Sequence, residues 1–344
     1  MKVKRQKFAV LSDGKKVHLY TVSNKEMSFS VTDYGCTLTS IVIPSKNGKK
    51  DDIVLGYPTI EGYMNTWSYY LGVFVGRFAN RIGDAQFKLN GKTYKLDNND
   101  NGNVLHGGFD CWSRIIWDAK EIETAEGTGV KFTYDSPDGD QGFPGNVKVE
   151  VCYLLNDDNQ LTLRYRATTD ADTPINFTNH AYYNLKGTGK GDILDHEVSL
   201  NADSYLEVND KLIPTGKKIS VKGTPFDFTS KKAVRKDIAG TGFGYDHCYC
   251  LNMAKSGLTK VAEVYEPETG RSMSISTNQP GVQFYTGNFL NNIQGKNGDI
   301  YNKHSGFCLE TQAFPDAPNK PEFPNCILHP GEVYEAVTVE SFKW

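Results

Sequence analysis

Hydrophobic and polar residues alternate with a period of two along several segments of the chain. Positions 147, 149, 151 and 153 are valine or tyrosine, whereas positions 148, 150 and 152 are lysine, glutamate and cysteine. Segment 161–166 repeats the pattern, with leucine and tyrosine alternating with threonine and arginine. Successive side chains of a strand point to opposite faces, so the pattern predicts strands with one buried and one solvated face.

Two short polar segments predict antiparallel hairpins. Segment 156–160, Asn-Asp-Asp-Asn-Gln, joins the two strands just described and has the length of a hairpin turn. The pair Asn90-Gly91 separates Phe87–Leu89 from Lys92–Tyr94. Because asparagine and glycine both tolerate positive φ, which a type I′ turn requires, we expect a second hairpin there.

The remaining pattern predicts an all-β protein. Further strands are expected at 130–134, 273–276, 282–285 and 333–342, and no long segment has the 3.6-residue period of an amphipathic helix. The 33 glycines and 14 prolines are spread between short strands, without a linker-like segment of low complexity. We therefore expect one large antiparallel β-sandwich domain over residues 1–344.

Charge and hydropathy narrow the class of protein. The 38 basic and 41 acidic residues are spread along the chain, for a net charge of −3, so a nucleic acid is not an expected partner. No apolar run approaches the roughly 18 residues that a membrane-spanning segment needs. Met1–Lys7 is basic, but the apolar stretch of a secretory signal does not follow it. We expect a cytoplasmic protein that keeps its seven cysteines reduced.

Five polar clusters interrupt the strand pattern. They are Gly76–Arg81, Leu105–Gly108, Asn179–Leu185, Tyr245–His247 and Leu309–Gln312. In this order and with this approximate spacing, the clusters resemble the galactose mutarotase (aldose 1-epimerase) family. The resemblance extends over nearly the whole chain, from Asp33-Tyr34-Gly35-Cys36 to the final strand. A fragment such as His-Gly-Gly is weak by itself, whereas five in the family's order are specific.

The resemblance implies a galactose mutarotase-like β-sandwich with an open cleft. It also implies that the protein is an enzyme that interconverts the α and β anomers of free aldohexoses such as glucose and galactose. It implies that His180 is the general acid and Glu310 the general base. It also implies that the sugar is lined by Asn80, Arg81, His106, Tyr182, Asp246 and Gln283. No cofactor or metal is implied, and the partner is a small-molecule aldose.

The chemistry requires groups of this kind independently of the resemblance. Opening a cyclic hemiacetal removes the proton of the anomeric hydroxyl, while the ring oxygen gains a proton. A carboxylate suits the first role and an imidazolium the second, because each exchanges protons near neutral pH once its surroundings tune it. The aldehyde rotates about its C1–C2 bond before the ring closes, so either anomer emerges.

Simpler roles compete for some of these residues. Arg77 shares a cluster with Arg81, and we expect Arg77 to be a structural partner of carboxylates or backbone carbonyls. Asp246 follows Gly244 and Tyr245, where an isolated aspartate often stabilises a turn, although the motif favours a sugar contact. Without the motifs, a lone His180 or Glu310 would more often be a surface or structural residue.

His247, Cys248 and Cys250 have the side chains of metal ligands. A structural zinc site needs four ligands, however, and no second cysteine or histidine pair stands at a suitable spacing. We expect the two cysteines to lie on one face of a strand as ordinary core residues.

Three other functions remain open from the residues. A glycoside hydrolase normally needs two carboxylates, whereas the expected pair is one carboxylate and one imidazole. A non-catalytic sugar-binding module would have the same cleft without needing both proton-transfer groups. A hexose-6-phosphate 1-epimerase would need a cluster of lysine or arginine beside the cleft, and the motif residues contain no clear one.

Overall fold

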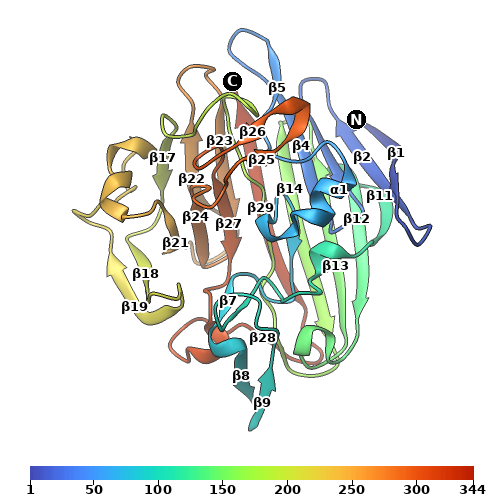
Figure 1. Ribbon diagram of the computed structural model, residues 1–344, viewed down its shortest axis with the longest axis vertical. Helices are drawn as coiled ribbons and strands as arrows, with labels where there is room; N and C mark the ends of the chain where they lie inside the picture. Colours follow the sequence, from blue (N-terminus) through green and yellow to red (C-terminus); the bar gives the residue numbers. More distant parts are fainter.

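The computed structural model describes residues 1–344 and consists almost entirely of strands (Figure 1). The single α-helix, α1 (Ile60–Asn65), has six residues, and eight short 3₁₀ turns complete the helical content. No helix has the length and apolar character that crossing a membrane requires. The expected all-β class is therefore confirmed.

A nine-stranded antiparallel sheet forms one layer of the fold. Its strands, in spatial order, are β11 (Asp118–Thr124), β12 (Gly127–Ser136), β13 (Val147–Leu155), β14 (Gln160–Thr169), β29 (Tyr334–Lys343), β23 (Ser272–Thr277), β22 (Thr259–Tyr265), β17 (Glu197–Leu200) and β20 (Lys232–Ala233). The C-terminal strand β29 lies at the middle of this sheet and pairs with β14 on one side and β23 on the other, so it joins the earlier strands to the later ones.

Two five-stranded sheets form the other layer. The N-terminal one comprises β1 (Lys2–Val10), β2 (Lys16–Ser23), β3 (Ser28–Thr32), β4 (Thr37–Pro44) and β5 (Lys50–Asp52). The second has the order β19 (Pro214–Ser220), β18 (Ser204–Val208), β21 (Asp246–Cys250), β24 (Gly281–Tyr285) and β27 (Cys308–Gln312). The three sheets form a sandwich-like arrangement (Figure 1).

Five two-stranded pairs fill the space between and beside the large sheets. They are β6 (Phe74–Val75) with β16 (Thr178–Asn179), β7 (Arg81–Ile82) with β10 (Val104–Leu105), β8 (Gln86–Leu89) with β9 (Lys92–Lys95), β15 (Thr173–Pro174) with β28 (Ile327–Leu328), and β25 (Ile293–Gln294) with β26 (Ile300–Tyr301). The β6–β16 and β7–β10 pairs position residues of the candidate site, because Arg81 begins β7 and His106 and His180 directly follow β10 and β16.

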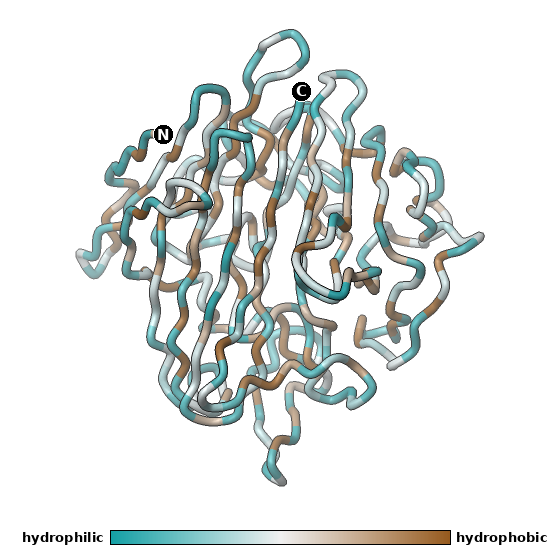
Figure 2. Tube along the Cα trace, turned by 180° about the vertical axis from the view of Figure 1, so that it is seen from behind, coloured by the Kyte–Doolittle hydropathy of each residue, from teal (hydrophilic) through white to brown (hydrophobic).

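A core of 52 buried residues lies between the layers. It contains Val282 and Phe284 of β24 together with Ile275 of β23, so the second five-stranded sheet packs one face on the nine-stranded sheet. Brown and teal segments alternate along the long strands of Figure 2, as expected for strands with one apolar face. The other face of β24 is left free to carry polar side chains.

The strands that we predicted from alternation are confirmed. Segments 147–153 and 161–166 lie in β13 and β14, which pair antiparallel. The segments expected at 130–134, 273–276, 282–285 and 333–342 lie in β12, β23, β24 and β29, except that Val333 precedes its strand.

The hairpin predicted at Asn90-Gly91 is confirmed. Strands β8 and β9 pair with Leu89 opposite Lys92, which leaves a two-residue turn. Asn90 has a φ of 51° and Gly91 a φ of 77°, both in the left-handed region that a type I′ turn requires.

Candidate active site

One wall of a cleft is built by the free face of three neighbouring strands. In the register of β24 and β27, Gln283 lies directly opposite Glu310, and in that of β21 and β24, Asp246 lies opposite Tyr285. Residues directly opposite, and residues two apart on one strand, share a face. Asp246, Gln283, Tyr285 and Glu310 therefore all project from the side of the sheet that faces away from the core.

The opposite wall comes from the small β7–β10 pair. Arg81 begins β7 and lies opposite Leu105 of β10, so Asn80 and His106 meet just beyond the pair. The His106 backbone N–H donates to the Asn80 carbonyl, and the Asn80 backbone N–H donates to Nδ1 of His106 at 3.1 Å. Both residues have positive φ, 64° and 52°, which turns the chain sharply at this point.

His180 also lines the cleft and stands directly after β16. Its backbone N–H donates to the Val73 carbonyl at 2.9 Å, and its carbonyl accepts from the Gly72 N–H at 3.0 Å. These two bonds fix the backbone of His180 beside the β6–β16 pair. Tyr182, two residues later, donates its hydroxyl to the Tyr69 carbonyl at 3.0 Å.

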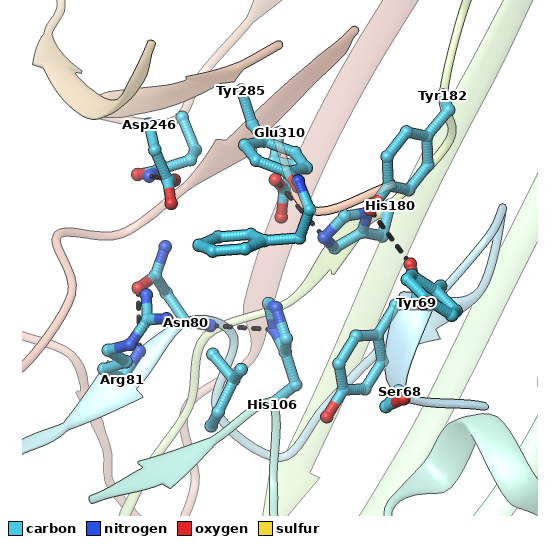
Figure 3. Close-up of a pocket in the computed structure, with 14 residues that line it drawn as sticks. Ser68, Tyr69, Asn80, Arg81, His106, His180, Tyr182, Asp246, Tyr285 and Glu310 are labelled. Carbon is cyan, nitrogen blue, oxygen red and sulfur yellow. Dashed lines mark hydrogen bonds and ion pairs between the residues drawn. The ribbon is translucent and has the colours of Figure 1, made fainter. Parts of the chain in front are cut away.

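The two walls line an open cleft (Figure 3). All eight residues named by the resemblance line it: Asn80, Arg81, His106, His180, Tyr182, Asp246, Gln283 and Glu310. The structure thus brings together residues from five separate sequence clusters.

His180 and Glu310 lie side by side in this cleft (Figure 3). Nε2 of His180 is 3.7 Å from Oε1 of Glu310, and only 5% and 2% of the two residues are exposed. Burial lowers the pKa of His180 to about 4 and raises the pKa of Glu310 well above its ordinary value. When the proton lies on His180, the imidazolium and the carboxylate of Glu310 attract each other. This attraction opposes both pKa shifts.

His106 enters the cleft as a neutral hydrogen-bond donor. The backbone N–H of Asn80 donates to Nδ1, so Nδ1 carries a lone pair and the ring proton must reside on Nε2. Burial, followed by the charges of His180 and Arg81, lowers the pKa of His106 well below its ordinary value. His106 is thus suited to donate one hydrogen bond and unsuited to act as a cation.

Ligand atoms of His106, His180 and Glu310 all lie within 4.8 Å of one another, close enough to suggest a metal site. A metal ligand must offer a lone pair from the ring nitrogen that faces the ion. The bond from Asn80 places that lone pair on Nδ1 and a proton on Nε2, so coordination through Nε2 would require breaking it. The donor set is therefore poorly matched to a metal ion.

The other polar groups have defined partners. Nε of Arg81 donates to Oδ2 of Asp100 at 2.7 Å, and Nε2 of Gln283 donates to Oδ1 of Asp246 at the same distance. Oε1 of Gln283 and Oε2 of Glu310 are buried and accept no hydrogen bond from the protein. Buried acceptors of this kind are suited to bind the hydroxyl groups of a ligand.

Arg77 does not line the cleft. It is fully buried, and its guanidinium donates to Oγ of Ser136 at 2.7 Å and to the carbonyls of Pro137 and Pro144 at 2.8 and 2.7 Å. These contacts are those of the structural role expected for Arg77. Cys248 and Cys250, which were also considered as metal ligands, are buried in an apolar cluster, as expected for core residues.

Sequence reasoning missed six residues that also line the cleft: Ser68, Tyr69, Tyr70, Leu105, Tyr285 and Phe289. Tyr285 stands two positions after Gln283 in an alternating strand, so the period of two was a usable signal for it. Tyr69 ends a short 3₁₀ turn, Trp67–Tyr69, and Tyr70 follows it, and no periodicity there indicates which side chain faces the cleft.

A β-sandwich with a small polar cleft and a paired carboxylate and imidazole is the framework of an enzyme for acid–base chemistry on a polar small molecule. A family model described as aldose 1-epimerase matches residues 18–341. The chain belongs to the aldose 1-epimerase family.

Individual relatives agree with this assignment. A galactose mutarotase from Rattus norvegicus is 42% identical over 334 residues, which are 96% of each chain. An aldose 1-epimerase from Escherichia coli K12 is 36% identical over 342 residues, 97% of each chain. The solved structure of an aldose epimerase homologue from C. elegans has a TM-score of 0.86 at 31% identity and covers 94% of this chain and 98% of its own. A galactose 1-epimerase from Lactobacillus acidophilus gives the same TM-score at 28% identity, covering 99% and 98%.

Proposed function

We propose that the protein is an aldose 1-epimerase, an isomerase that interconverts the α and β anomers of free aldohexoses such as glucose and galactose. The observation that carries the proposal is the buried pair of His180 and Glu310, with Nε2 and Oε1 3.7 Å apart in a cleft lined by polar side chains. One carboxylate and one imidazole are the two groups that hemiacetal opening needs.

In the proposed reaction, Glu310 takes the proton of the anomeric hydroxyl while protonated His180 gives a proton to the ring oxygen. The bond between C1 and the ring oxygen breaks, and C1 becomes an aldehyde carbon. After rotation about the C1–C2 bond, His180 takes the proton back from the hydroxyl that was the ring oxygen, and Glu310 returns its proton to the carbonyl oxygen. Both groups end in the states in which they began.

The pair alternates between two states during this cycle, an imidazolium with a carboxylate and a neutral imidazole with a carboxylic acid. Burial favours the neutral pair, as the lowered pKa of His180 and the raised pKa of Glu310 indicate. Attraction between opposite charges favours the ion pair. These opposing effects support a pair that transfers a proton in either direction at a small cost.

The remaining cleft residues supply complementary hydrogen bonds to a polyhydroxylated ring. The Nε2–H of His106 is suited to donate to an oxygen that gains negative charge, and Arg81 is suited to donate to a second oxygen. Asp246 and Gln283 offer acceptors on the opposite wall. Asn80 and Tyr182 complete the predicted sugar contacts.

The charge of the cleft supports a neutral aldose as substrate. Arg81 is the only lysine or arginine among the 14 residues that line it, and its Nε is bound to Asp100. A phosphorylated sugar would require more positive charge around its phosphate. We further propose that residues 1–344 act as one domain. We also propose that the protein works in the cytoplasm.

Polarimetry of freshly dissolved α-glucose and α-galactose tests the proposal. The protein should accelerate the approach to the equilibrium rotation well beyond the rate in buffer. Glu310→Gln and His180→Asn should each bind sugar and lose that acceleration. Binding of sugar by the unaltered protein without any acceleration would support a non-catalytic module instead, and a strong preference for glucose 6-phosphate would replace the neutral substrate.

A further inference from the structure

Tyr70 contacts both histidines of the cleft, yet no sequence motif singled it out. Its ring centroid lies 4.6 Å from that of His106, edge to face, and 5.8 Å from that of His180, with only 28° between the planes. Tyr182 supplies a second ring near His180, at 5.0 Å and 29°. The imidazole of His180 is therefore stacked on two phenol rings.

The backbone of Tyr70 is held in an uncommon conformation. Its φ is 54°, in the left-handed region that bulky residues rarely adopt. The Tyr70 N–H donates to the Trp67 carbonyl at 2.9 Å, and the Tyr70 carbonyl accepts from the Val73 N–H at 3.3 Å. In this backbone conformation, the aromatic ring of Tyr70 lies against His180.

Stacking of this kind acts differently on the two forms of His180. The face of an aromatic ring carries partial negative charge, so it attracts a cation within about 6 Å of its centroid and has less effect on a neutral imidazole. Both ring distances at His180 fall within that limit. Glu310 is the one carboxylate within 4.0 Å of a ring nitrogen of His180, at 3.7 Å.

We propose that Tyr70 is a positioning residue whose ring, together with that of Tyr182, stabilises the imidazolium form of His180 on which proton transfer depends. The inference rests on the proposed epimerase function, because it assigns a role within that reaction. The Tyr70 ring acts through His180 rather than on the sugar, so its loss should lower kcat more than it raises KM.

Two substitutions separate the ring of Tyr70 from its hydroxyl. Tyr70→Phe keeps the aromatic face, so kcat should remain within about threefold of the unaltered protein. Tyr70→Leu removes the aromatic face, and kcat should fall roughly tenfold, with KM for galactose changed by less than about threefold. Phe109→Leu is a matched control, because Phe109 is 47% exposed and does not line the cleft.

Because Tyr70→Leu also changes shape, a second experiment keeps the shape and varies only the charge on the ring face. Phenylalanine analogues with none, one, two or three ring fluorines are incorporated at position 70, and kcat is measured by polarimetry. Fluorine withdraws electron density from the ring face, so log kcat should decline steadily with the number of fluorines while KM stays constant. A flat series in protein that remains active would overturn the inference. Absence of activity in the unaltered protein would instead reject the proposed function.

Discussion

Nε2 of His180 faces Oε1 of Glu310 across 3.7 Å, while Nδ1 of the same ring lies 3.6 Å from Sγ of Cys308. Cys308 and Glu310 are two positions apart on β27, so one face of a single strand contacts both ring nitrogens. This arrangement turns Nε2 rather than Nδ1 toward the cleft. The strand that supplies the proposed base thereby also orients the proposed acid.

The pair should behave as one unit when it is mutated. Glu310→Gln and His180→Asn should each lower kcat at least about a hundredfold, the usual contribution of a general acid or base. The double variant should lose little more than the worse single variant, because either loss already disables the cycle. Steady-state polarimetry on galactose measures all three proteins. Multiplicative losses would mean that the two groups act independently.

Much of this cleft could be predicted because its residues lie in short motifs and alternating strands. Gln283 and Glu310 stand in β24 and β27, where every second residue faces away from the core. The hairpin at Asn90-Gly91 was predictable for a local reason, since two adjacent residues tolerate positive φ. The family resemblance then selected which polar residues to bring together.

Other features depend on contacts between distant segments, and no local pattern reveals those contacts. Tyr70 reaches the cleft through a left-handed backbone that tertiary packing holds in place. Asp100 lies in a polar segment with the composition of an ordinary loop, but its carboxylate binds Arg81. Alternation predicted the strand that contains Glu340, yet only the fold shows why a carboxyl can face the core there.

Asp100 should affect substrate binding through Arg81. Its carboxylate accepts the Nε–H of Arg81 at 2.7 Å, and 11% and 20% of the two side chains are exposed. Asp100→Asn weakens this charge-assisted bond, so Arg81 should be less well held and KM for galactose should rise roughly tenfold, with kcat changed by less than about threefold. Asp84→Asn is the matched control, since Asp84 lies nearby, is exposed and does not line the cleft. Equal KM values for the two variants would contradict the prediction.

Arg77 should affect stability and leave sugar binding unchanged. Its buried guanidinium donates to Ser136 and to two carbonyls, and Arg77→Met would remove all of these hydrogen bonds. We expect a loss of about 3–5 kcal/mol in the free energy of unfolding, measured by urea denaturation. Arg166→Met, an exposed change on β14, should cost less than about 0.5 kcal/mol. If the folded fraction of Arg77→Met showed a raised KM, Arg77 would have to contact the substrate or its binding residues.

Glu340 should make the protein less stable as the pH rises from about 4.5 to 7. It is buried between the layers, where Tyr183 donates its hydroxyl to Oε1 at 2.6 Å and Oε2 has no partner. Desolvation raises the pKa of Glu340 to about 7. The folded protein therefore binds a proton that the unfolded chain has released between about pH 4.5 and 7, so stability from this group decreases across that window and stays low above it.

Glu340→Gln removes this titration while its amide oxygen can still accept the hydrogen bond from Tyr183. Relative to the variant, the unaltered protein should lose roughly 3 kcal/mol of unfolding free energy between pH 5 and pH 8, measured by urea denaturation at each pH. Glu335→Gln, an exposed change on the same strand, should leave the pH dependence nearly as it is. Parallel stability curves for Glu340→Gln and the unaltered protein would show that Glu340 titrates with an ordinary pKa, and the buried carboxyl would then have to be ionised and solvated at neutral pH.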